Sequence, residues 1–487
     1  MFWGSRRGRV WGIVGALVLL GAGMALVMGL RRVRLPSRVS DSHVCEGADH
    51  AWAGVWDGPR KATLEAAFLA TGRPFAQESW RHVRRTLDAY SHTWDVTWTA
   101  ACAAARGRGE EALRAQREAC LDGRLAQVDA LLRRLAPGDV VRVEHAPFAV
   151  EALPSLAACM KPGALAAPDA VVLDAWALLV LGLPEEGLRH LARASGSGLG
   201  TEGAASLRDE PAASPVRAEG AAARSRDEGA SGGASGVGAT VDVVDPVGRA
   251  LIRARLEAAR SGPSAEALAV EAGRLAEASR DDASAARAWT LAMRLVGNPP
   301  EQASRAQQWR ERASASLSRL GGEDELEGQL AVDVARLFAH QDRLGEAAQQ
   351  IALALPRLER RFGAEGFEVA HARAELGAVR RAQGRYAEAL GLYERALGTV
   401  RGALGPDHPE VARLRLEQAE TRVRQRDLAQ AERLSLGALA VLERALGPEH
   451  PRLEEALARV AAVLEQEGRA EEAKPYRERL ARLRAHP

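Results

Sequence analysis

Apolar residues recur at helical spacing over residues 78–105 and again over residues 110–135. Gly107 and Gly109 interrupt the pattern between these stretches, so we expect the two helices to fold back as a hairpin. The same spacing continues over residues 173–194. Ala is common and aromatic residues make up only 4% of the chain, which favours helices over sheets. The pattern therefore predicts an all-α protein.

The helical pattern becomes periodic after residue 320, with a repeat of 42 residues. The motif LGPDHP begins at Leu404 and LGPEHP at Leu446, while QGRYAEA at Gln383 is followed by QRDLAQA at Gln425. Equivalent loops are marked by Gly321, Gly363, Gly405 and Gly447. A fixed period of this size is typical of a solenoid of paired helices. We predict four 42-residue repeats over residues 321–487.

Small side chains at three positions of each repeat keep the same register, as expected where two helices cross closely. The three columns are Ala335, Gly377, Ala419 and Ala461; Ala347, Ala389, Ala431 and Ala473; and Ala354, Ala396 and Ala438, with Leu480 as the terminal exception. Offsets of 12 and then 7 residues resemble the tetratricopeptide repeat, and the 42-residue period with its LGPDHP loop resembles the kinesin-light-chain variety. Residues 246–320 resemble about two degraded copies, in which Ala292, Ala306 and Ala313 approximate the columns.

Two histidines in these loops, His408 and His450, each precede a proline. Pro409 and Pro451 suit the first turn of a helix, where no backbone donor is needed. Asp407 or His408 can cap the helix start. We therefore predict a structural role for both histidines, without catalysis.

A run of 21 uncharged residues, 10–30, follows a short polar N-terminus of residues 1–9. As a helix the run spans about 31 Å, which matches the hydrocarbon core of a bilayer. A cleavable signal peptide is the nearest rival, but the run is long, and arginines follow it directly where a cleavage site is expected. We predict an uncleaved, single-pass transmembrane helix.

Charge leaves the orientation of this helix open, because arginines lie on both sides of it. Gly21, Ala25 and Gly29 share one helix face at a spacing that lets two copies pack as a homodimer. Chance also accounts for that spacing, since small residues are common in membrane helices.

A helical domain over residues 45–194 contains all four cysteines: Cys45, Cys102, Cys120 and Cys159. Cys102 and Cys120 lie on opposite arms of the predicted hairpin, so a bridge between them is plausible and would leave Cys45 for Cys159. The sequence leaves all three connectivities open, as well as four buried free thiols. Disulfides would indicate an oxidising compartment.

Composition changes abruptly over residues 195–245, which are rich in Gly, Ser and Ala and predict a disordered linker or insertion. The net charge is +2, and arginines alternate with acidic residues, so nucleic-acid binding is not expected. His43, Cys45 and His50 match no standard zinc spacing. We predict no metal and no cofactor.

Most of the chain from the membrane span onward resembles the C-terminal half of bacterial serine/threonine protein kinases that carry a tetratricopeptide array. The resemblance rests on AGVWD at Ala53, AFLATGRP at Ala67, REACLDGRL at Arg117, RLGGEDELEGQLAVDVARLF at Arg319 and the LGPDHP loops. It implies that residues after the span face the periplasm. No kinase glycine loop, HRD or DFG motif occurs, and the single asparagine, Asn298, lies in a GNPP turn, so kinase activity is not expected.

These features predict a non-catalytic scaffold, sensor or adaptor in the bacterial inner membrane, with its C-terminal region in the periplasm. A protein or peptide ligand would bind the concave groove lined by the first helix of each pair. Candidate binding residues, which ordinary solvated surface also explains, are Arg373, Arg380, Arg415 and Arg422. The alternative is the regulatory half of a kinase system, with a separately encoded kinase as partner.

Overall fold

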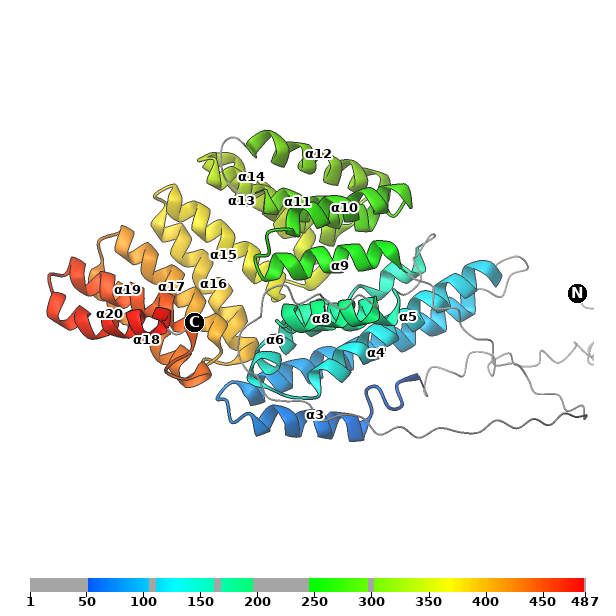
Figure 1. Cartoon of the computed structure of the whole chain (residues 1–487), viewed down its shortest axis with the longest axis horizontal. Helices are drawn as coiled ribbons and strands as arrows, with labels where there is room; N and C mark the ends of the chain where they lie inside the picture. The colour runs from blue at the N-terminus through cyan, green and yellow to red at the C-terminus, as the bar shows by residue number, and fades with distance from the viewer. Residues whose placement is uncertain (1–50, 105–110, 162–167, 196–244, 297–301, 486–487) are drawn as a thin grey trace, which may run out of the picture. The chain divides into compact units, whose positions relative to one another are not determined.

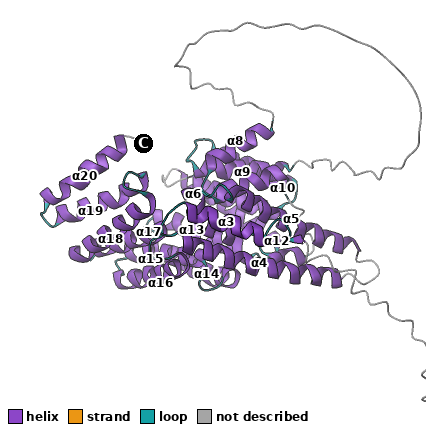
Figure 2. Ribbon diagram, turned by 90° about the horizontal axis from the view of Figure 1, so that it is seen from below, coloured by secondary structure: helices purple, strands orange, loops and turns teal. Residues whose placement is uncertain are grey.

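The computed structural model describes residues 51–104, 111–161, 168–195, 245–296 and 302–485. All regular secondary structure in these ranges is helical, which confirms the predicted fold class (Figure 2). The predictions for residues 1–9 and 10–30 and nearly all of the 195–245 linker lie outside the described residues. Within the described ranges, no helix is both long enough and apolar enough to cross a membrane.

The first described helices form a group that we call the bundle. Its members are α3 (Gly58–Ala70), α4 (Ala76–Ala104), α5 (Glu111–Leu135), α6 (Val140–Glu151) and the 3-10 helix η2 (Leu156–Met160). Helices α4 and α5 are the arms of the predicted hairpin, and the buried Trp94 indole donates to the Leu121 carbonyl at 2.8 Å between them. Asp57 and Asp139 begin α3 and α6 by accepting hydrogen bonds from backbone amides of the first turn.

Seven helix pairs follow among the described residues, and we call them the array (Figure 1). They are α7 (Ala170–Val180) with α8 (Pro184–Ala194), α9 (Pro246–Ala259) with α10 (Ala265–Ala278), α11 (Asp282–Leu295) with α12 (Ala303–Leu320), α13 (Asp324–His340) with α14 (Leu344–Phe362), α15 (Phe367–Ala382) with α16 (Tyr386–Leu404), α17 (Pro409–Arg424) with α18 (Leu428–Leu446), and α19 (Glu454–Gln466) with α20 (Ala470–Ala485). A short 3-10 helix, η4 (Pro451–Leu453), precedes α19.

The small-residue columns lie where the helices of the last four pairs cross. The alanines of the second column are all 0% exposed: Ala347, Ala389, Ala431 and Ala473. At Gly377, in the first column, an added Cβ would lie 2.9 Å from the ring of Tyr393. The close approach predicted from the sequence is therefore confirmed, and at Gly377 no larger residue fits without displacing that ring.

The pair α7/α8 belongs to the array, although it precedes the long 195–245 segment. Val172, Ala175 and Leu191 share a buried cluster with Ile252 and Leu256 of α9. Gly187 lies so close to Leu256 that an added Cβ would be 2.6 Å from its side chain. Ala175 and Gly187 also show the 12-residue offset of the later repeats, so the spacing signal for this pair was present in the sequence and missed.

The suggested Cys102–Cys120 bridge is wrong. Cys120 in α5 is bonded to Cys159 in η2, 39 residues later, and Cys102 is also disulfide-bonded. The hairpin arms do bring Cys102 and Cys120 onto neighbouring helices, but spacing along two helices does not fix which faces the side chains occupy. The fold instead returns η2 against α4 and α5.

Candidate ligand-binding cavity

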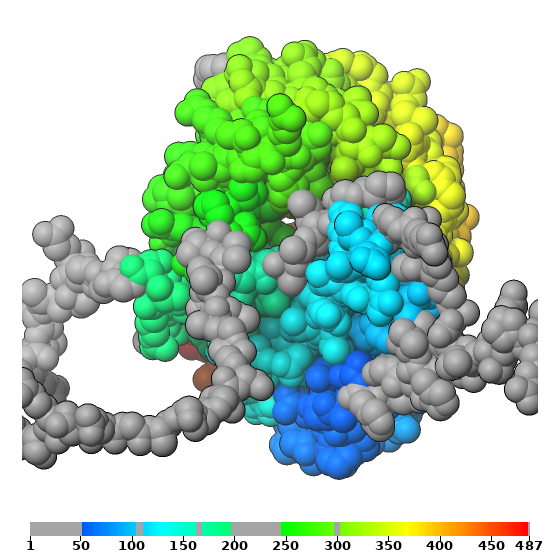
Figure 3. Space-filling view, turned by 90° about the vertical axis from the view of Figure 1, so that its right-hand side faces the viewer, coloured from blue at the N-terminus to red at the C-terminus, as the bar shows by residue number. Residues whose placement is uncertain are grey.

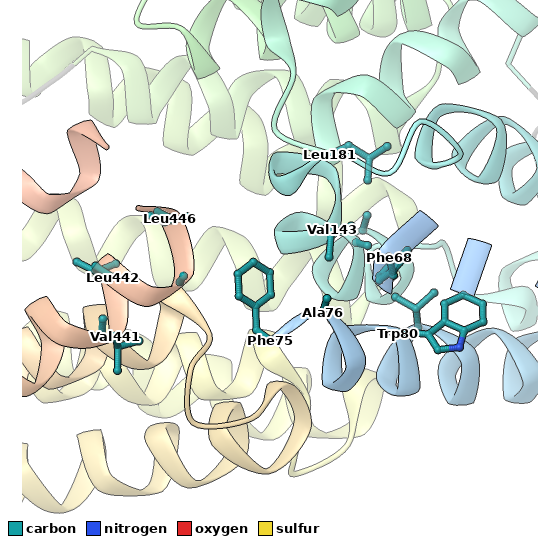
Figure 4. Close-up of a cluster of buried hydrophobic side chains, with 14 of the residues drawn as sticks. Phe68, Phe75, Ala76, Trp80, Val143, Leu181, Val441, Leu442 and Leu446 are labelled. Carbon is teal, nitrogen blue, oxygen red and sulfur yellow. The ribbon is translucent and has the colours of Figure 1, made fainter. Parts of the chain in front are cut away.

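The bundle meets the last repeats at an apolar contact that we call the junction. Phe75, fully buried, belongs to one hydrophobic cluster with Leu442 and Leu446 of α18 and with Leu453. Figure 4 shows its ring between the α18 side chains and Ala76 of the bundle. The predicted inter-repeat loops thus form a docking surface for the N-terminal helices.

His408 completes the junction. Its Nδ1 accepts from the Glu410 amide at 3.1 Å and caps α17, as predicted, so its Nε2 carries the proton and donates to the Glu144 carbonyl of α6 at 3.2 Å. The side chain is 0% exposed, and its ring lies 5.2 Å from that of Phe75. Burial lowers the pKa of His408 to about 3. The neutral histidine therefore joins the loop to the bundle through two hydrogen bonds.

Three further contacts strengthen the junction. The ring of Phe148 in α6 lies 4.7 Å from that of Phe367, at the start of α15. The Phe367 amide donates to the Glu151 carboxylate at 3.0 Å. Arg452 also pairs with Glu144, whose side chain is only 8% exposed. Each polar group named here has a hydrogen-bond or ion-pair partner. The junction therefore combines apolar packing with polar groups that are all paired.

The bundle and the array also line a cavity of about 1790 Å³, whose walls include the junction residues Phe148, Phe367 and His408. In Figure 3 the cyan bundle helices lie beneath the green helices of the first pairs. The walls come from α5, α6 and η2 of the bundle and mainly from first helices of the pairs: α7, α9, α11, α13, α15 and α17. The second helices α14 and α16 contribute Leu358, Phe362 and Val400. First helices therefore line the inner surface, as the sequence predicted, but that surface faces the chain's own bundle.

Four arginines without ion-pair partners among the described residues define one part of this cavity. We call Arg124 of α5, Arg255 of α9, and Arg287 and Arg294 of α11 the arginine cluster. Burial and the neighbouring guanidiniums of Arg287 and Arg294 lower the pKa of Arg255 to about 10. Burial also lowers the pKa of Arg124, whose Nε is buried without a hydrogen-bond partner in the described structure.

Most carboxylates of the cavity are already engaged. Glu325, the acid that acts on both Arg124 and Arg255, pairs with Arg361 at 3.0 Å. The other ion pairs are Asp333–Arg336 at 2.7 Å, Glu410–Arg413 at 2.6 Å, Asp169–Arg249 at 2.8 Å, Glu323–Lys161 at 3.4 Å, and Glu144–Arg452. Asp245 and Asp281 accept from helix N-termini. None of these carboxylates forms an ion pair with the arginine cluster. The charges of Glu325 and Asp333 act on it only from beyond ion-pair distance.

Two acids of the lining, Asp122 and Glu368, have no ion pair among the described residues. Burial raises the pKa of both carboxyls, and nearby acids raise them further. A carboxyl with a raised pKa resists ionisation, because burial disfavours the charged form. Neither of these two groups forms an ion pair with the arginine cluster.

The candidate binding arginines lie away from this cavity, since none of the four is among its lining residues. Arg373 pairs with Glu359 at 3.1 Å, Arg380 with Glu388 at 3.4 Å, and Arg422 with Asp427 at 3.4 Å. Arg415 makes no ion pair within the described ranges, and burial lowers its pKa. Three of the four arginines are therefore held in ion pairs within the repeats.

The arginine cluster was missed because its members come from three helices that the sequence does not bring together. Arg287 and Arg294 are seven residues apart and share one face of α11, but charged residues on one helix face usually indicate solvated surface. No group of three or more His, Cys, Asp and Glu side chains that could hold a metal occurs in the described parts of the chain.

Comparison with known proteins agrees with the repeat assignment. Residues 368–435 and 423–452 each match a family model described as tetratricopeptide repeat. No curated protein matches the sequence.

Solved structures similar to this chain include BtubC (BKLC) from P. vanneervenii, with 20% identity, a TM-score of 0.39, and coverage of 50% of this chain and 94% of that one. A Podosopora anserina putative kinesin light chain is 19% identical, with a TM-score of 0.35 and coverage of 44% and 96%. The apo form of RapI is 10% identical, with a TM-score of 0.40 and coverage of 64% and 75%. On the family matches, residues 368–452 are tetratricopeptide repeats.

Proposed function

We propose that this protein is a membrane-anchored, non-catalytic scaffold or adaptor whose tetratricopeptide repeats bind a protein or peptide partner. One observation carries the proposal: residues 368–452 match a repeat family, and such arrays generally bind partners through their extended surfaces. The bundle contacts the repeat loops and the inner surface of the array, which leaves the outer repeat surfaces accessible.

Affinity capture of the full-length chain, cross-linked in its native membrane, tests partner binding. The double variant Arg373→Glu/Arg415→Glu reverses two of the candidate binding residues. Arg482→Glu, an exposed residue of α20 without an ion pair in the described structure, is the matched control. A partner lost from the double variant and retained by the control supports the proposal. Identical sets of captured proteins from all three chains would reject these binding residues.

The uncharged run over residues 10–30 supports the proposed anchor, and the cysteines support a periplasmic location for the chain after residue 30. Placing two arginines in the run, Leu19→Arg/Leu20→Arg, should release the chain from membranes at alkaline pH, whereas Arg38→Gln should not. A C-terminal reporter active only outside the cytoplasm should be active. A cytoplasmic C-terminus would contradict the periplasmic assignment.

Regulation of a separately encoded kinase is the second candidate. Its support is the sequence resemblance, two stretches of which supply walls of the cavity: Cys120 to Arg124, and Glu323 to Arg336. A serine/threonine kinase among the captured proteins, with autophosphorylation changed by adding this chain, would favour this role. Capture of partners without any kinase would exclude it.

A further inference from the structure

The arginine cluster places four guanidiniums around one water-accessible space. Arg287 and Arg294 lie two turns apart on α11, about 10 Å along the helix axis, and both are exposed to the cavity. Arg255 faces them from α9, and Arg124 reaches the same space from the bundle. Like charges gathered at one site repel each other, and no acid among the described residues forms an ion pair with any of the four.

These side chains remain cations at neutral pH. Even Arg255, the most perturbed, has a pKa of about 10, well above 7. Arginine presents its donors in a planar fork that matches carboxylate and phosphate oxygens. An anion shared by several guanidiniums would supply the ion-pair partner that these side chains lack.

Apolar side chains lie beside the cluster and favour an organic ligand. Leu173 and Trp176 of α7 and Ile252 of α9 contribute to the same walls. The volume of about 1790 Å³ exceeds the roughly 300–1,000 Å³ of a typical small-molecule site, so a ligand would share the space with water.

We propose that the cavity binds a small polyanion, with two or more carboxylate or phosphate groups held between Arg124 of the bundle and Arg255, Arg287 and Arg294 of the array. Such a ligand bridges the bundle and the array across the cavity that the junction also borders. It relieves the repulsion among the arginines and thereby stabilises the closed arrangement. This inference does not depend on the proposed scaffold role or on the membrane anchor.

Binding is measured on the detergent-solubilised full-length chain with two probes, sodium pyrophosphate and sodium citrate. Sodium chloride at matched ionic strength accounts for general screening. Calorimetry gives the Kd and thermal unfolding gives the shift in Tm. We expect at least one probe to bind and to raise Tm. Pyrophosphate alone would identify a phosphate ligand, and citrate alone a carboxylate ligand.

Two variants of α9 make a matched pair. Arg255→Gln removes a guanidinium from the cavity, whereas Arg253→Gln changes an exposed arginine, two residues away, that does not line it. We expect the Kd to rise about tenfold or more for Arg255→Gln, as for loss of a charge-assisted contact, and to stay within about twofold for Arg253→Gln. Arg287→Gln should behave like Arg255→Gln.

The Tm measured without anion distinguishes anion binding from a purely structural role for these arginines. If the four arginines repel one another, Arg287→Gln should leave the Tm measured without anion unchanged or raise it. The same variant should lose the increase in Tm that the anion produces in the wild type. A lower Tm without anion, together with anion binding equal to that of the wild type, would overturn the proposal. So would the absence of binding by both probes, or equal weakening in Arg253→Gln.

Discussion

The interface between the bundle and the array has two parts of opposite character, which border the same cavity. At the junction, Phe75, Phe148 and His408 form a buried contact in which the histidine satisfies donors and acceptors on both sides. At the cavity, four arginines face one another across accessible space without ion-pair partners among the described residues. Burial of apolar area stabilises the first contact, whereas the second is left electrostatically incomplete.

The difference separates a contact that holds the fold together from one that is available to a ligand. A buried polar group without a partner is costly, so a permanent interface satisfies its members. A site for an exchangeable ligand must keep groups unpaired while it is empty. The same bundle can therefore serve both as a structural support and as one wall of a binding site.

The largest effect should come from Phe75→Ala, which removes a fully buried ring from the junction. We expect a loss of about 3–5 kcal/mol in the free energy of unfolding, as for other buried aromatic residues. Leu69→Ala, at a position that is 49% exposed, is the control and should cost less than about 0.5 kcal/mol. Denaturant titration measures both, and equal losses would show that the junction is not a stabilising core.

Replacing the Cys120–Cys159 disulfide by two alanines should cost about 2–4 kcal/mol, because the bond closes a long loop in the unfolded chain. The bond joins α5 to η2, so the effect should be local to these two elements. Hydrogen exchange should quicken in η2 and the adjacent turns of α5, while amides around His408 keep their protection. Equally faster exchange in both regions would show that the disulfide and the junction do not stabilise separate parts of the bundle.

Acid should weaken the junction through His408. The group is neutral when folded, with a pKa of about 3, but it binds a proton below about 6.5 when unfolded. Stability is therefore unaffected above pH 6.5 and falls as the pH drops toward 3, by up to about 1.4 kcal/mol per unit. Between pH 7 and 5, the wild type should lose about 2 kcal/mol more than His408→Asn, in which asparagine still caps α17.

His450 supplies the control for this pH effect. It caps η4 in the same way, through an Nδ1 that accepts from the Arg452 amide, but it is only half-buried. Burial lowers its pKa as well. We expect His450→Asn to change the pH dependence less than His408→Asn does. Equal effects would indicate that the buried link to the bundle is not what sets the acid sensitivity.

The smallest effects concern two glycines of one repeat. Gly377→Ala forces a Cβ against the Tyr393 ring and should cost about 1–3 kcal/mol. Gly398→Ala, on the exposed face of α16 with open space around it, should stabilise by about 0.5–1 kcal/mol. Thermal unfolding distinguishes these opposite signs. A neutral Gly377→Ala would mean that the small-residue column tolerates wider helix spacing.

Local chemistry made several features predictable. The hairpin of α4 and α5, the helix pairs after residue 320 and the cap at His408 all follow from spacing within one or two helices. The α7/α8 pair carries the same 12-residue offset at Ala175 and Gly187, but a long segment of different composition separates it from the next pair. Because of that interruption, the sequence pattern did not identify α7/α8 as the first pair of the array.

Periodicity alone thus determined the repeats of this protein, because side chains that recur every 42 residues must meet the same neighbours in each copy. Only the tertiary structure decided what the inner surface faces. His408 reaches Glu144 across 264 residues, and the arginine cluster joins α5 to α9 and α11. Such contacts depend on how helices distant in the chain pack against each other, and no local pattern encodes which of their charges remain unpaired.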